Sequence, residues 1–203
     1  MIAFMLLLTS SSPPYQPQPD PRALFRADDY PPAAAARGEQ GTAIARLVVD
    51  PTGRVEACAV EISTGSKDLD LTTCEILRHR AKYRPLVGPD GAPLYQVIRT
   101  PPITWSIGGP VPAPTVGPDI ELTINEAPPN VKLPLDIYIK YIVDPDGAVK
   151  SCGLTPVSPV APQVLVDFAC RAAGELPDRI ARKADGQAVE AQDASHVRFL
   201  LGK

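Results

Sequence analysis

Four cysteines are the residues whose type and spacing point most directly to a chemistry. Cys58 is followed by Cys74, and Cys152 is followed by Cys170 at a similar distance. The chain holds no CxxC motif and only 2 histidines, so zinc coordination and thioredoxin-type redox exchange are poor interpretations. An even number of cysteines in an exported chain indicates disulfide bonds instead. The alternative is four buried free thiols.

The sequence offers no other set of residues that forms a catalytic or metal site. His79 stands among the cations of the segment 78–84, and His196 has no plausible nucleophile near it. The serines lack a nucleophile-elbow motif, and no glycine-rich phosphate loop is present. The turns at 50–53 and 144–147 lack the alternating acidic ligands of a calcium loop. We therefore predict a protein that is not an enzyme and that holds no cofactor and no metal.

Composition narrows the class of protein further. The net charge of −3 is too mild for a general nucleic-acid binder, so no nucleic acid is expected as a partner. The 25 prolines predict many turns, linkers and strand edges and few long helices. Apolar residues make up 44% of the chain, which suffices for a hydrophobic core.

The N-terminus predicts export. Residues 1–8 form an apolar run that is too short to span a bilayer, which takes about 20 residues. Followed by small residues, the run is typical of a secretory signal, although a basic segment before it is missing. We predict a signal peptide at residues 1–12 and no transmembrane segment in the mature chain. A mildly apolar terminus is one alternative, and a true start further upstream, which makes the protein membrane-associated, is another.

The clearest structural signal is an internal repeat. The segment 49–58, which reads VDPTGRVEAC, returns at 143–152 as VDPDGAVKSC. The second cysteine of each half follows at a similar distance, and the segment 89–91 is echoed at 184–186. Because these landmarks keep a nearly constant offset, the chain carries two copies of one unit.

Each unit has the same expected order of elements. A strand at 42–49 or 135–143 leads into an Asp-Pro-x-Gly turn, which closes a hairpin because Pro presets φ and Gly accepts a positive φ. The second strand holds the first cysteine, a helix holds the second, and a last strand follows at 95–107 or 196–200. The expected apolar helix faces are Leu71, Cys74, Leu77 and Ala81 in the first unit and Val166, Cys170 and Ala173 in the second.

This order predicts an α+β fold of two tandem small domains. Each is a short antiparallel sheet of about three strands packed against one or two helices, with one disulfide. In each unit one cysteine lies on an inward strand position and the other on the sheet-facing side of the helix. We therefore predict the disulfides Cys58–Cys74 and Cys152–Cys170, and closing such a loop stabilises a chain by about 3 kcal/mol.

Proline-rich segments mark the domain boundaries. The segment 108–118 reads GGPVPAPTVGP, a composition that forbids regular structure and indicates a semi-rigid linker. The predicted organisation is a signal peptide at 1–12, a Pro-rich linker at 13–28, a first domain at 29–107, a Pro/Gly linker at 108–119 and a second, degenerate copy at 120–203.

The first unit carries an ordered set of short motifs, which are Asp29-Tyr30-Pro31, Gly38, Gly41, the hairpin Val49-Asp50…Gly53-Arg54-Val55, Ser63-Thr64-Gly65, Leu69-Asp70, Lys82-Tyr83-Arg84-Pro85, Gly91-Ala92-Pro93 and Pro102-Ile103-Thr104-Trp105. In order and spacing, this set resembles a known family, the C-terminal domain of TonB-type energy transducers. Residues 120–203 resemble this family only through the repeat, because they have no Tyr-Pro box and no Tyr-x-Pro after the helix.

The resemblance implies a periplasmic protein-binding module of receptor-dependent transport at the outer membrane. In the family, a short peptide of the receptor plug pairs along an exposed edge of the small sheet. Tyr30 and Pro31 are equally open to a structural role, in which they fix the path of the chain onto the sheet. Carried over to this sequence, the partner-binding residues are Asp29, Tyr30, Pro31, Gln96, Val97, Ile98 and Arg99.

A structural or scaffold protein of the envelope is the alternative function. Its duplicated domains associate with each other or form a homodimer, and the sister domain, not a receptor peptide, caps the sheet edges. A TonB-type transducer also needs a membrane anchor and a long spacer, for which residues 1–8 and 13–21 are too short. We therefore expect a soluble relative that binds, competes for or scaffolds envelope partners.

Overall fold

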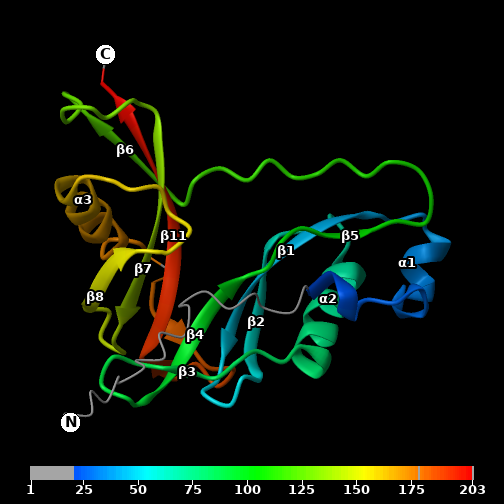
Figure 1. Cartoon of the computed structure of the whole chain (residues 1–203). Coiled ribbons are helices and arrows are strands. Elements are labelled where there is room, and N and C mark those ends of the chain that lie inside the picture. The colour runs from blue at the N-terminus through cyan, green and yellow to red at the C-terminus, as the bar shows by residue number, and fades with distance from the viewer. Residues whose placement is uncertain (1–20, 178, 203) are drawn as a thin grey trace, which may run out of the picture.

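The computed structural model describes residues 21–177 and 179–202, so the predicted signal peptide at 1–12 lies outside the described residues. The fold is α+β and consists mainly of strands (Figure 1). In chain order, the elements of the first unit are η1 (Pro21–Leu24), η2 (Ala27–Asp29), α1 (Pro32–Ala36), β1 (Gly41–Val49), β2 (Val55–Ile62), α2 (Lys67–Arg80), β3 (Leu86–Val87), β4 (Pro93–Arg99) and β5 (Ile103–Trp105).

The second unit follows a segment, residues 106–119, that contains no helix or strand and runs from the end of β5 across to the start of the next strand (Figure 1). Its first strand, at 120–124, was not predicted from the sequence. The elements of this unit are β6 (Ile120–Ile124), β7 (Leu135–Val143), β8 (Val149–Leu154), α3 (Gln163–Ala173), β9 (Ala181–Arg182), β10 (Ala188–Val189) and β11 (Ala191–Leu201).

The two units share one sheet. Its strand order is β2-β1-β4-β11-β7-β8, with β5 beside β1, β3 beside β4 and β6 beside β11. The units meet where β4 and β11 run parallel, with Tyr95 opposite Ala191 and Gln96 opposite Gln192. The sequence predicted two separate sheets of about three strands. The structure differs because β4 of the first unit and β11 of the second each have an edge with unpaired backbone groups, and these two edges pair with each other.

The helices of the two units lie on opposite faces of this sheet. Leu47 and Val49 of β1 point toward α2, where they pack with Leu77. Val48 points the other way and packs with Ala191 of the second unit. On β11, Ala191 shares its face with residues that pack against α3, because alternate residues of a strand point to the same side.

Two sequence expectations about the first unit need correction. Leu71 is 60% exposed, and the buried side chains of α2 are instead Leu69, Thr73, Ile76 and Leu77. The predicted single strand at 95–107 is divided into β4 and β5 by the prolines at 101 and 102, which have no N–H for a ladder. In the second unit, Val166 and Ala173 are buried as expected.

Both predicted disulfides are present. Cys58–Cys74 joins β2 to α2, with its Cα atoms 5.6 Å apart. Cys152–Cys170 joins β8 to α3, with its Cα atoms 5.8 Å apart. Each bond therefore fastens the helix of a unit to the outermost strand of its sheet.

The two Asp-Pro-x-Gly turns have matching hydrogen bonds. The Asp50 carboxylate accepts from the N–H of Thr52 and of Arg54, at 2.8 and 2.9 Å. The carboxylate of Asp144 accepts in the same way from residues 146 and 148, at 3.0 and 2.9 Å. Gly53 closes the first turn at φ +85°, and its C=O accepts from the Tyr83 N–H at 2.8 Å. The turn therefore also docks the chain that leaves α2.

None of the helices within residues 21–177 and 179–202 is long and apolar enough to cross a membrane.

Removing the first disulfide with the double substitution C58A/C74A is expected to lower the free energy of unfolding by about 2–4 kcal/mol, because the unfolded chain then gains the entropy of the open loop. Urea denaturation followed by circular dichroism measures this change. C152A/C170A opens a loop of similar length in the other unit and is expected to have an effect of similar size. An unchanged urea midpoint for C58A/C74A contradicts the expectation.

Candidate functional site

The predicted site residues Asp29, Tyr30 and Pro31 fasten the N-terminal segment to α2 and β5. Asp29 forms a two-pronged ion pair with Arg80 of α2, at 2.5 and 2.6 Å. The Tyr30 ring meets the Trp105 ring edge-on, with centroids 5.4 Å apart, and its hydroxyl donates to a backbone carbonyl, that of Glu39. Pro31 precedes α1 as its N-cap residue. The structural role considered for Tyr30 is therefore present.

Trp105 is the anchor of this corner. Its indole N–H donates to the Thr73 hydroxyl at 2.8 Å, and that hydroxyl donates to the Leu69 carbonyl at 2.8 Å. The Phe25 ring also packs edge-on against the Trp105 ring, with centroids 5.4 Å apart. Because Trp105 is the last residue of β5, these contacts hold β5 firmly beside β1.

Three of the four predicted site residues on β4 have side chains that are already used inside the protein. The Gln96 amide donates to the Arg84 carbonyl at 2.7 Å. Val97 is buried at the junction of the two units, and Ile98 packs toward α2. Arg99 is the exposed member of the set. A partner at β4 can therefore contact the Arg99 side chain and the backbone.

The outer side of β4 is open beyond Gln96. The pairing with β11 ends at that residue, and no other strand of the described residues pairs with 97–99 or with β5 on that side. The Thr100 N–H donates to the Ala45 carbonyl of β1 at 2.8 Å. Since successive amides of a strand point in opposite directions, the Arg99 amide points away from β1 and toward this open side.

On the facing edge of β11, in contrast, the backbone amides already have hydrogen-bond partners. The Ala194 N–H donates to the carboxylate of Asp193 at 2.7 Å. The His196 N–H donates to the Asp119 carboxylate at 2.7 Å, and the His196 carbonyl accepts from the Asp119 N–H at 2.8 Å. Residues 197–201 then pair with β6. Between its pairing with β4 and its pairing with β6, the amides of Ala194 and His196 on β11 are therefore bound by the carboxylates of Asp193 and Asp119.

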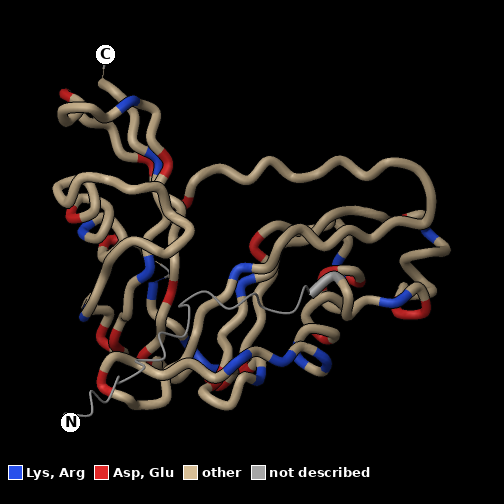
Figure 2. Tube along the Cα trace, viewed as in Figure 1, with Lys and Arg blue, Asp and Glu red and all other residues tan. Residues whose placement is uncertain are grey.

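The same two aspartates bind arginines of the first unit. Asp193 lies 2.6 Å from the Arg46 guanidinium, and Asp119 lies 2.8 Å from that of Arg99. Arg99 also contacts Glu61 of β2 at 2.8 Å. Burial raises the pKa of the Asp193 carboxyl above its usual value, and Arg46 opposes this shift. Figure 2 shows basic positions on the strands of the first unit and an acidic position on β11.

Sequence reasoning missed Asp119 and Asp193, although a signal for one of them exists. Asp193 stands at the inward-facing parity of β11, which it shares with Val197 and Phe199. An aspartate at such a position indicates a buried partner of opposite charge. The partner, Arg46, lies 147 residues earlier in the chain, so the repeat alone does not reveal it.

His196 has a structural setting. Its Nε2 lies 2.6 Å from Asp136, its ring stacks on Tyr138 at 4.8 Å, and Arg198 binds the same carboxylate at 2.8 Å. These are cross-strand pairs between β7 and β11. Within the described ranges, no cluster of three or more His, Cys, Asp or Glu side chains is placed to hold a metal ion.

Comparison with known proteins identifies a family for the first unit. Residues 26–107 match the family model described as the Gram-negative bacterial TonB protein C-terminal, which confirms the family indicated by the sequence of the first unit. The matched segment begins at Arg26, immediately before η2, and ends just after β5. No curated protein and no solved structure matches the chain.

Replacing Asp29 with asparagine tests the ion pair that holds the N-terminal segment. The Arg80 hydrogen bond holds the pKa of Asp29 below its ordinary value. The carboxylate therefore stabilises the fold above the unfolded-state pKa of about 3.9, and this contribution is lost as pH falls through the lower folded-state pKa. We expect Asp29→Asn to lower the free energy of unfolding by about 1 kcal/mol at neutral pH.

The difference between the Asp29→Asn variant and the unchanged protein is expected to shrink toward zero as the pH drops below this range. Urea titrations across acidic and neutral pH measure it. Asp28→Asn, at the exposed neighbouring carboxylate, is the control. A difference that is independent of pH contradicts the role given to the ionised carboxylate.

Proposed function

Because residues 26–107 belong to the TonB C-terminal family, we propose that this chain is a periplasmic protein-binding module of receptor-dependent transport at the outer membrane. Its partner is an extended peptide from the plug of an outer-membrane receptor. The peptide pairs with the outer side of β4 and β5, beyond Gln96.

The unpaired outer side of β4 and β5 is the observation that carries this proposal. An edge strand has a row of backbone donors and acceptors that a second extended chain can complete. Trp105 and Tyr30 hold β5 rigidly, so the edge needs little ordering before a partner pairs with it. The edge belongs to the unit that matches the family.

Recognition at this edge is mainly a matter of backbone geometry. Gln96, Val97 and Ile98 have side chains that serve the protein interior. Arg99 contributes the exposed charge, which is already shared with Glu61 and Asp119. In this proposal Asp29, Tyr30 and Pro31 contribute indirectly, since Tyr30 packs on Trp105 of β5 and Asp29 fastens the same segment to α2.

The second unit, residues 120–203, is proposed to be a degenerate copy that supports the first. The matching turn hydrogen bonds at Asp50 and Asp144 and the matching disulfides favour a common origin. Its own last strand, β11, is paired with β4, β7 and β6, and its remaining edge amides bind carboxylates. Among the described residues, the β11 edge is therefore occupied, whereas the facing edge of β4 and β5 in the first unit is unpaired beyond Gln96.

A scaffold role in the envelope is a second candidate, and the pairing of β11 with β4 favours it. At Tyr95 and Gln96, the second unit pairs with the edge of β4. This is the arrangement expected of a sister domain that caps the sheet edge of its neighbour. In this role the chain binds no receptor peptide, and it associates with other envelope proteins or with a second copy.

Two variants of Arg99 separate the functions. Arg99→Pro removes the amide that points to the open side and retains the β1 pairing of Thr100. Arg99→Ala removes the charge and keeps the amide. We expect synthetic N-terminal plug peptides of outer-membrane receptors to bind the unchanged protein saturably. Arg99→Pro is expected to weaken this binding at least tenfold, which is about 1.4 kcal/mol, and Arg99→Ala is expected to change it little.

Fluorescence anisotropy with labelled peptides measures these affinities, and circular dichroism confirms that both variants fold. Equal losses in Arg99→Pro and Arg99→Ala contradict pairing through the backbone. The absence of binding by any plug peptide, together with a stable dimer in sedimentation experiments, supports the scaffold function instead.

A further inference from the structure

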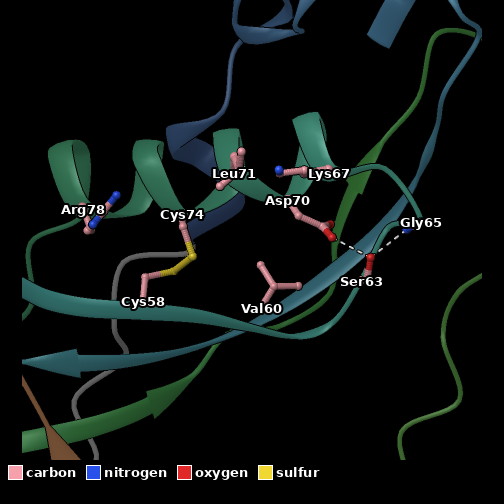
Figure 3. Close-up of a pocket in the computed structure, with 9 residues that line it drawn as sticks. All are labelled: Cys58, Val60, Ser63, Gly65, Lys67, Asp70, Leu71, Cys74 and Arg78. Carbon is pink, nitrogen blue, oxygen red and sulfur yellow. Dashed lines mark hydrogen bonds between the residues drawn. A yellow bond between two sulfur atoms is a disulfide. The ribbon is translucent and has the colours of Figure 1, made fainter. Parts of the chain in front are cut away.

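A second surface of the first unit, away from the β4 edge, has the features of a binding groove. A pocket of about 450 Å³ lies between β2 and α2, beside the Cys58–Cys74 disulfide (Figure 3). Cys58 and Val60 point into it from β2, and the helix contributes its other wall. The residues that line it are Cys58, Val60, Ser63, Gly65, Lys67, Asp70, Leu71, Cys74 and Arg78.

The strand at the floor of the groove has an open edge. β2 is the end strand of the sheet, and among the described residues only β1 pairs with it. The amide and carbonyl of Ala45 on β1 face β4, because both groups bond to Thr100. By alternation the groups of Arg46 face its partner Ala59 on β2, so the backbone of Cys58 and Val60 faces outward.

The helix wall is apolar at its centre and basic at both ends. Lys67, Leu71, Cys74 and Arg78 are spaced by four, three and four residues, so they form one stripe along α2. Leu71 is exposed, and Figure 3 shows Lys67 and Arg78 at opposite ends of the pocket. Neither cation has an ion-pair partner among the residues that the structure describes. Basic positions also gather near the C-terminal end of α2 (Figure 2).

Asp70, the acidic residue that lines the groove, already accepts hydrogen bonds from neighbouring residues. The Asp70 carboxylate accepts from the Ser63 hydroxyl at 2.5 Å and from the Thr64 N–H and hydroxyl at 2.9 and 2.8 Å. These bonds close the loop between β2 and α2. The carboxylate keeps its charge but is held by these donors at the loop, and the two cations Lys67 and Arg78 leave the lining with a net positive charge.

The second unit lacks this stripe at the matching positions. Counted from the helix cysteine, Lys67 and Leu71 correspond to Gln163 and Asp167, which hydrogen-bond to each other at 2.8 Å. Arg78 corresponds to Gly174, which follows the end of α3. The basic and apolar stripe is therefore not required by the helix-to-sheet packing that the two units share.

We propose that the groove between β2 and α2 binds a second extended peptide, with an apolar side chain at its centre and an acidic residue at each end. The peptide pairs with the outward backbone of Cys58 and Val60, places its apolar side chain on Leu71 and the disulfide, and meets Lys67 and Arg78 with its carboxylates. The stripe from Lys67 to Arg78 spans roughly 16 Å at 1.5 Å per helical residue. An extended strand covers this length with about five residues.

The probe is a labelled pentapeptide of sequence Glu-Thr-Val-Thr-Glu with blocked ends, and its partner control is Lys-Thr-Val-Thr-Lys. We expect the acidic peptide to bind the full chain saturably and the basic peptide to bind at least tenfold more weakly. The double substitution K67Q/R78Q, which installs the neutral residue found at position 163, is expected to weaken binding of the acidic peptide about tenfold. Its effect shrinks as salt is added.

K132Q/R171Q is the matched control, since it removes the same charge from the second unit. Nuclear magnetic resonance shifts of backbone amides locate the site, and we expect them at Glu56–Val60. Shifts confined to 97–105, unchanged binding in K67Q/R78Q or equal binding of both peptides overturn the proposal, as does a dimer formed through β2 that excludes the peptide. Because Arg99→Pro leaves this groove intact, failure of the β4 proposal and failure of this one give different results.

Discussion

The amides and carbonyls of Tyr95–Gln96 and Ala191–Gln192 join the two units into one sheet, and the rest of the molecule is arranged around this parallel pairing of β4 with β11. It fixes which face of the first unit is buried, because Val48 and Val97 then lie under β9, β10 and Ala191. It also removes two residues of β4 from the edge on which a partner can pair. What remains open begins at residue 97, and its neighbours are charged.

The carboxylates beside this pairing take part in two kinds of interaction. Asp193 and Asp119 accept hydrogen bonds from β11 amides, and they bind Arg46 and Arg99 of the other unit. A strand edge that ends in carboxylates is a poor template for another strand, since an approaching carbonyl meets negative charge instead of a donor. The edge of β4 has no such protection. The asymmetry between the two edges therefore comes from these carboxylates and from β6, which covers the end of β11.

Local features of this fold could be predicted from the sequence, and contacts between the units could not. The Asp-Pro-x-Gly turns, the bounds of β7 and the two disulfides follow from short spacings in which proline, glycine and cysteine act on their own neighbourhood. The β4–β11 pairing depends on two edges that are far apart in the chain, and no residue pattern specifies which edge meets which. Leu71 was placed wrongly because an apolar residue at a plausible spacing was taken for a core residue, whereas α2 buries Thr73 to satisfy Trp105.

The opposite placement of α2 and α3 on the shared sheet also has a consequence for how many partners the protein can hold. A duplicated domain often raises affinity through avidity, since two equal sites engage one multivalent target together. Here a flat target, such as a membrane or a receptor surface, that touches the helix of one unit meets the far side of the other unit. The two units therefore cannot present their helices in the same direction. The chain is a two-sided molecule and not a bivalent one.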